Sequence, residues 1–103
     1  MFKLVAYVPE ISLTEVKTAL FEAGAGRLGN YDCCSWQVLG EGQFRPLEGS
    51  NPHLGTKDEI EVVPEWRLEV LVKEDILSDA ITAMKKAHPY EEPAYEVYQC
   101  VDV

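Results

Sequence analysis

A repeated pattern of apolar residues constrains the fold most, and it becomes visible when the sequence is shifted along itself by 64 positions. Leu4 then aligns with Leu68, and the matches continue through Val8–Val72, Leu13–Leu77, Leu20–Met84, Ala23–Ala87 and Tyr31–Tyr95. In each half the apolar period changes from two to about 3.6 and back to two, which predicts a strand, a helix and a second strand. We therefore expect the element order βαββαβ.

Two such halves with right-handed crossovers interleave into a four-stranded antiparallel sheet with both helices on one face, which is the ferredoxin-like α+β arrangement. We expect the whole chain, residues 1–103, to form this single domain. The strands are predicted at residues 2–8, 31–39, 65–73 and 94–101.

Local signals predict where the helices begin and end. Ser12 to Glu15 has the pattern of a capping box, and Asp75 is placed to cap the second helix. Gly24 is expected to end the first helix in a left-handed conformation, and Pro89 to end the second. Residues 24–29 match G-x-G-x-x-G, but the glycines leave a helix and enter a strand, which favours a turn over a nucleotide site.

The connection between the second and third strands, residues 40–63, is unusually long and rich in glycine and proline. Connections beyond about 12–15 residues are usually functional or disordered. The prolines favour an ordered arm, such as an extended hairpin that returns through residues 60–63. Phe44, Arg45 and His53 lie on this arm.

The sheet face opposite the helices is predicted to be too apolar for a monomer. Its expected residues are Val5, Tyr7, Cys34, Trp36, Val38, Leu71, Tyr98 and Cys100. A patch of this size typically marks a partner surface, so we expect a closed homo-oligomer that buries these faces. The alternative is that the arm folds back and covers them.

Composition excludes several classes of function. The formal net charge of −9 argues against general nucleic-acid binding, and it suits either divalent cations or solubility alone. No targeting signal or membrane-spanning stretch is visible, so we expect a cytoplasmic protein with no membrane partner. Cys33, Cys34 and Cys100 do not form a disulfide framework, and the adjacent pair is expected to point to opposite faces of a strand.

The segment from His88 to Pro93 places one imidazole and two carboxylates between two prolines that restrict the backbone. His88, Glu91 and Glu92 could therefore form part of a metal site or an acid–base pair. A structural role is favoured by the residue chemistry alone: His88 would cap the helix and the glutamates would stay solvated. Tyr90 is expected to pack the turn on the core.

Three motifs in order carry a resemblance to a known family: residues 24–31 (GAGRLGNY), Gly40 to Gly49 with Phe44 and Pro46, and residues 88–95 (HPYEEPAY). The sequence resembles the YqfO group, which is similar to the inserted middle domain of the NIF-three-like dinuclear-metal proteins. This resemblance implies a PII/CutA-like domain of ferredoxin-like topology that associates as trimers. In PII-like proteins the corresponding arm contacts ligands or partners near subunit clefts.

The larger relatives hold two metal ions in flanking domains through several His, Asp and Glu ligands. This sequence has no such domains and only two histidines, His53 and His88, so we do not expect the hydrolase-like activity sometimes attached to the family.

The favoured hypothesis is a non-catalytic trimeric binding or sensor module whose clefts are made by the 40–63 arm and the His88–Glu92 turn. A divalent metal ion is a candidate ligand, through His88, Glu91, Glu92 and His53, and Phe44, Arg45 and Tyr90 are candidate ligand-binding residues. The alternative is a structural module that binds a protein partner through the arm. A small metal-dependent hydrolase, with His88 as general base, is disfavoured because no complete set of catalytic groups supports it.

Overall fold

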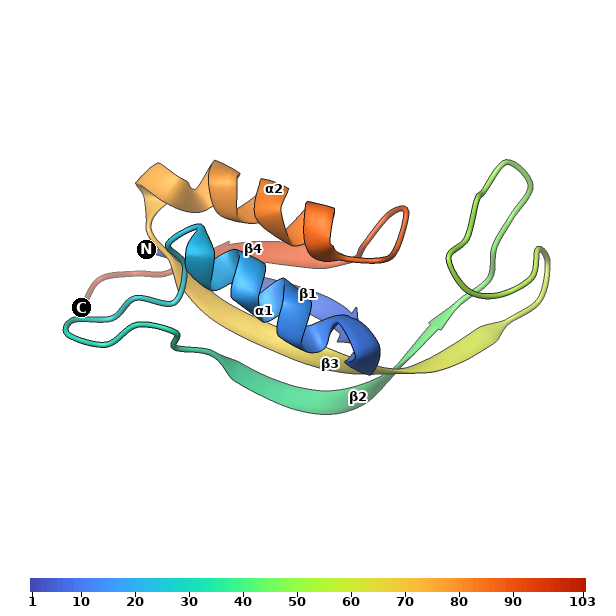
Figure 1. The fold of residues 1–103 in the computed structure, drawn as a ribbon, viewed down its shortest axis with the longest axis horizontal. Coiled ribbons are helices and arrows are strands. Elements are labelled where there is room, and N and C mark those ends of the chain that lie inside the picture. The colour runs from blue at the N-terminus through green and yellow to red at the C-terminus, as the bar shows by residue number, and fades with distance from the viewer.

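The computed structural model describes all 103 residues and contains one antiparallel sheet with the strand order β2-β3-β1-β4. Both helices cover the same face of this sheet (Figure 1). The elements are β1 (Phe2–Pro9), α1 (Leu13–Glu22), β2 (Trp36–Phe44), β3 (Glu61–Val72), α2 (Leu77–Ala87) and β4 (Tyr95–Gln99). The predicted ferredoxin-like α+β fold is confirmed.

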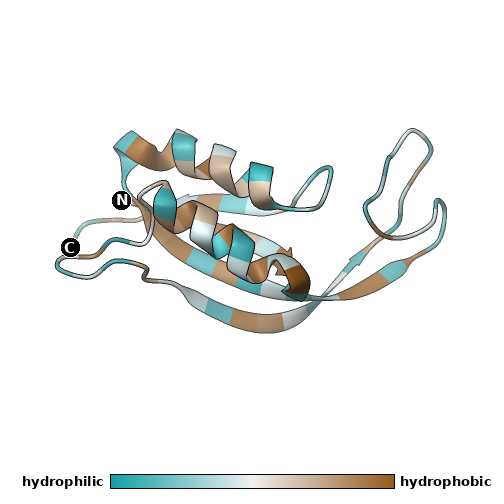
Figure 2. Ribbon diagram, viewed as in Figure 1, coloured by the Kyte–Doolittle hydropathy of each residue, from teal (hydrophilic) through white to brown (hydrophobic).

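The core lies between the helices and the two central strands. Alternate residues of β1 and β3 face the helices, and the buried members of this layer are Leu4, Ala6, Val8, Leu68, Val70 and Val72. The helices contribute Val16, Leu20, Ala80 and Met84. Figure 2 shows the alternation of apolar and polar residues along the strands that produces this one-sided burial.

The predicted repeat holds through the first strand and the helix of each half. A 3-10 turn at Glu10–Ser12 precedes α1, and its equivalent at Glu74–Ile76, 64 positions later, precedes α2. The register fails in the second strands. Tyr95 begins β4, whereas its counterpart Tyr31 lies outside β2 and is 75% exposed.

The predicted helix caps are wrong at both N-termini. Ser12 occupies the N-cap of α1 but makes no side-chain capping bond, and Ile76 rather than Asp75 occupies the N-cap of α2. The cause is the 3-10 turn in each half, which supplies a backbone bond where a side-chain cap was expected. The predicted C-termini are correct: Gly24 has φ +100° after α1, and α2 ends at Ala87 before Pro89.

The glycine motif at residues 24–29 forms the turn between α1 and the loop before β2, as predicted. A Cβ at Gly26 would lie 2.7 Å from the carbonyl oxygen of Cys34, so the loop folds tightly against this glycine. Cys33 has φ +54° and lies with Cys34 in this loop. The prediction that the two cysteines point to opposite faces of a strand is therefore wrong, because β2 begins at Trp36 instead of Tyr31. All three cysteines are free thiols.

The predicted arm is a hairpin that extends the sheet beyond the helices (Figure 1). Strands β2 and β3 stay paired as far as Phe44 and Glu61, and the amide of Asp58 donates to the carbonyl of Pro46 at 2.7 Å near the base of the loop. The return through residues 60–63 is confirmed. It continues into β3 as one 12-residue strand instead of ending before Glu65.

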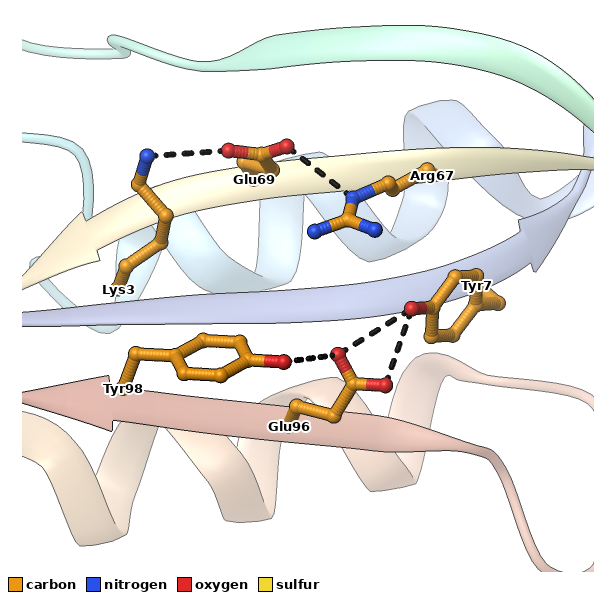
Figure 3. Close-up of polar contacts among 6 residues, drawn as sticks. All are labelled: Lys3, Tyr7, Arg67, Glu69, Glu96 and Tyr98. Atoms are coloured by element: carbon orange, nitrogen blue, oxygen red, sulfur yellow. Dashed lines mark hydrogen bonds and ion pairs between the residues drawn. The ribbon is translucent and has the colours of Figure 1, made fainter.

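The sheet face opposite the helices carries more charge than predicted. Lys3 and Arg67 both pair with Glu69 at 3.1 Å, and the hydroxyls of Tyr7 and Tyr98 donate to Glu96 (Figure 3). The neighbouring side chains bury Val5 completely, and Cys34 does not lie on a strand. The predicted apolar patch is thus smaller than expected.

An apolar part of this face nevertheless remains open. Trp36, Val38 and Tyr98 are 59%, 43% and 51% exposed. The alternative that the arm folds back over this face is therefore wrong for the single chain. Neither helix combines the length and apolar composition that crossing a bilayer would require.

Candidate ligand-binding site

A cavity of about 760 Å³ lies where the arm meets the turn after α2. It is lined by residues 43–50, 52–54 and 90–92, together with Tyr7, Glu65 and Ala94. The arm and the turn are held together by one hydrogen bond, in which the amide of Asn51 donates to Glu91 at 3.1 Å. Segments 40 residues apart in the sequence thus form a single site.

The turn has a fixed course because of its prolines. Pro89 stops α2 and forces the preceding residue out of the helical region, so that His88 has ψ 136°. The chain then passes through Glu91 and Glu92 before β4 begins at Tyr95. This reversal places Tyr90 between the core and the arm.

His88 anchors the turn from within the protein. It is only 5% exposed, and both ring nitrogens are engaged: Nδ1 accepts from the amide of Tyr90 at 3.1 Å, and Nε2 donates to the carbonyl of Tyr7 at 2.7 Å. Burial lowers the pKa of His88, although the bond to Tyr7 opposes this change. Because the ring is buried and both nitrogens are bonded to backbone groups, His88 has a structural role, which argues against the general-base role of the hydrolase alternative.

Tyr90 is the centre of a cluster of aromatic rings. Its ring centroid lies 4.9 Å from that of His88, 6.0 Å from Phe44 and 6.3 Å from His53. The two longer contacts join the turn to the arm. Burial, followed by the nearby carboxylates of Glu65 and Glu61, raises the pKa of Tyr90 to about 12. The buried hydroxyl has no hydrogen-bond partner, although the Glu65 carboxylate is near enough to help raise its pKa.

Glu65 is a cavity residue that the sequence analysis did not identify. It lies on β3 opposite Gly40, and its carboxylate occupies the space where a Cβ at Gly42 would stand. Glu65 is half-buried and forms no ion pair. The available signal was the pair Gly40 and Gly42 at the start of the predicted arm, because glycines in an extended segment often mark a close approach of another group.

The structure brings six of the seven predicted site residues to the cavity, namely Phe44, Arg45, His53, Tyr90, Glu91 and Glu92. The seventh, His88, packs behind Tyr90 and does not line it.

The predicted metal set does not fit this arrangement. No three His, Cys, Asp or Glu side chains are grouped so that they could hold a metal ion. His88 would also have to give up a hydrogen bond in order to coordinate one. Within a single chain these side chains can present carboxylates and aromatic rings to a ligand, but they do not form a metal centre.

Comparisons with known proteins relate the chain to part of larger proteins. It is 44% identical over 98 residues to a "GTP cyclohydrolase 1 type 2 homolog" of Halalkalibacterium halodurans, a match that covers 95% of this chain and 26% of that protein. The chain therefore spans about a quarter of the length of the curated relatives it matches. No family model matches the chain.

Solved structures give the same relationship. A Bacillus cereus protein related to NIF3 superposes with a TM-score of 0.81 at 41% identity, over 94% of this chain and 24% of that one. The periplasmic divalent cation tolerance protein CutA from Archaeoglobus fulgidus superposes with a TM-score of 0.71 at 16% identity, over 100% of this chain and 87% of that one. The second match shows a shared fold alone.

Proposed function

The chain is a homologue of one segment of the NIF3-related proteins, as its motifs predicted, and from this relationship we propose that it is a non-catalytic, homo-oligomeric binding or sensor module. The cyclohydrolase name belongs to relatives about four times as long, and we do not extend that activity to this segment.

The cavity between the arm and the turn is the observation that carries the proposal. It collects residues from the two segments that the sequence singled out, and one hydrogen bond and two aromatic contacts join them. A concave site with aromatic walls and a few polar groups is typical of ligand-binding pockets. The arm would then report ligand binding because it forms one wall of the site.

The homo-oligomer is proposed to be a trimer that associates through the open sheet faces. Trp36, Val38 and Tyr98 supply exposed apolar area beside the charged network of Figure 3. Interfaces commonly combine aromatic side chains with such polar surroundings.

In its narrower form, the proposal is that the ligand of this module is a divalent metal ion. Glu91, Glu92 and His53 all line the cavity, and a protein of the same fold is described as a divalent cation tolerance protein. A second subunit would have to supply further donors, because one chain does not provide a metal-binding group of three.

The second candidate function is a protein-interaction module that uses the arm. Four large apolar side chains are exposed on the arm: Leu47, Leu54, Ile60 and Val62. Their exposure would be explained by a protein partner seated on the hairpin. On this hypothesis deletion of the arm abolishes capture of the partner, and small ligands leave the cavity unchanged.

The test is an NMR titration of the isotope-labelled protein with a panel of probes: zinc and manganese chlorides, inorganic phosphate, and small organic cations and anions. The proposal predicts saturable shifts confined to amides of the cavity residues in at least one titration. A matched variant with residues 47–58 replaced by a short turn should lose them. Shifts that are absent for every probe, or that persist in the shortened variant, would overturn the proposal.

A further inference from the structure

We propose that the cavity binds an organic cation that carries a guanidinium group. This inference rests on the proposed function and names the ligand class of that same site.

The charges that line the cavity are unbalanced. Four carboxylates, those of Glu48, Glu65, Glu91 and Glu92, face a single guanidinium, that of Arg45. None of the five belongs to either of the chain's ion pairs, both of which lie on the open sheet face and involve Glu69. A cleft lined by one sign of charge concentrates ligands of the opposite sign, so the site favours a cation.

Aromatic rings favour a flat and weakly hydrated cation. The tilted rings of Phe44 and His53 flank Tyr90, with interplanar angles of 53° and 46°. Rings in this arrangement present faces on which a guanidinium can stack. A guanidinium is more weakly hydrated than an ammonium and stacks on aromatic faces, so it loses less on entering such a site.

The carboxylate of Glu65 supplies the hydrogen-bond acceptor. Glu65 is half-buried and has no ion pair. It therefore lacks what a guanidinium provides, namely several N–H donors in one plane. Two N–H groups of the ligand would donate to this carboxylate, while the Tyr90 hydroxyl, which is closed to solvent, makes no contact with the ligand.

A bare metal ion explains these features less well. The cavity of about 760 Å³ is far larger than an ion needs, and no three of the carboxylates and the imidazole that line it are grouped so that they could hold one. An organic cation uses the aromatic walls and the carboxylates that have no ion pair together.

The experiment titrates the labelled protein with agmatine, which joins a guanidinium to a short alkyl amine, and follows the backbone amides by NMR. Butylamine tests the ammonium alone, and an arginine-containing tripeptide amide tests whether a peptide can deliver the same group. We expect saturable shifts of the cavity amides with agmatine and at least severalfold weaker binding of butylamine. The tripeptide should bind only if the natural guanidinium is the side chain of an arginine in a protein.

Single substitutions that change the charge or the aromatic wall of the cavity test the class of ligand. Glu65→Gln should weaken agmatine binding about tenfold, because a charged hydrogen bond is lost. Phe44→Leu should weaken it about threefold through the lost ring face. Arg45→Gln should strengthen it by removing a like charge, whereas an anionic ligand would show the reverse. Glu22→Gln and Tyr31→Leu, which alter exposed residues outside the cavity, serve as matched controls and should change nothing.

The inference is overturned if agmatine causes no saturable shift, or if Glu65→Gln binds it as tightly as the wild type. If zinc, manganese or an anionic probe then still shifts the cavity amides, the proposed binding function stands and only the ligand class is wrong. If no probe shifts them, both fail.

Discussion

At the scale of single residues, His88 links three parts of the fold. It follows the last turn of α2, donates to the carbonyl of Tyr7 on β1 and accepts from the amide of Tyr90 in the turn. The conspicuous histidine of the sequence therefore acts beneath the cavity, and it fixes the position of the ring that forms the cavity wall.

Replacement of His88 by Ala should lower the free energy of unfolding by about 2–4 kcal/mol, because two hydrogen bonds are lost and their backbone partners stay buried. Urea unfolding monitored by circular dichroism measures the change. His53→Ala is the control and should cost less than about 0.5 kcal/mol, since His53 is exposed. Equal costs would contradict the structural role of His88.

The stability should also depend on pH through His88. Burial lowers its pKa in the folded state below the unfolded value, so the folded protein binds fewer protons between the two values. This contribution is fully present above the unfolded pKa of about 6.5 and is lost as the pH falls through the folded pKa. Unfolding measured from pH 7.5 to 5 should show declining stability in the wild type and in His53→Ala. A decline of the same size in His88→Ala would show that other groups cause it.

Tyr90→Phe should leave stability unchanged or raise it by about 1 kcal/mol. The hydroxyl is buried without a hydrogen-bond partner, so its removal eliminates a desolvation cost while the ring contacts remain. Thermal and urea unfolding both measure the effect. A loss of more than about 1 kcal/mol would mean that the hydroxyl is bonded in the free protein, with Glu65 as the nearby acceptor.

At the scale of elements, the apolar period predicted those features of the fold that depend on the burial of apolar side chains. The two half-units and the buried face of each helix follow from residues such as Leu13 and Leu77, which pack against the core. The start of β2 could not be predicted, because the loop path depends on how tightly Cys34 approaches Gly26 and on a positive φ at Cys33. The sequence alone shows neither this close approach nor this backbone angle.

The candidate site was predictable to the same extent. Turn and arm residues stand out through their prolines, glycines and aromatics, and they do line one cavity. Glu65 was missed because it fits the alternation of an ordinary strand, and its role depends on its pairing with β2. The orientation of His88 depends on contacts with β1, 81 positions away.

A pair of glycines on β2 allows a controlled test of this pairing. Gly42→Ala would place a Cβ in the space of the Glu65 carboxylate, whereas at Gly40 the nearest atom would be 3.8 Å away. Because the Glu65 side chain can move, both variants should stay within about 1 kcal/mol of wild-type stability. Gly42→Ala alone should weaken agmatine binding in the NMR titration. Equal binding by the two variants would remove Glu65 from the site.

At the scale of the whole molecule, the open sheet face joins a charged network to exposed aromatic residues. The network satisfies the polar groups near the centre, while Trp36 and Tyr98 remain available to a neighbouring copy. This distribution differs from the apolar face predicted from the sequence, because Lys3 pairs with Glu69 and Tyr7 donates to Glu96 across neighbouring strands (Figure 3).

Sedimentation equilibrium at micromolar concentration should show an oligomer for the wild type, with a trimer as the proposed state. Trp36→Arg should shift it toward the monomer, because a charge replaces an aromatic side chain in the contact. Tyr31→Arg changes an exposed aromatic residue outside the sheet and should leave the mass unchanged. A wild-type protein that sediments as a stable monomer would contradict the proposed assembly.

The arm and the turn together form the proposed site, and a crystal structure grown with agmatine tests this most directly. We predict that the Asn51–Glu91 hydrogen bond is present and that electron density for the guanidinium lies between Phe44, Tyr90 and Glu65. An arm detached from the turn, with Tyr90 open to solvent and no ligand beside it, would contradict the account.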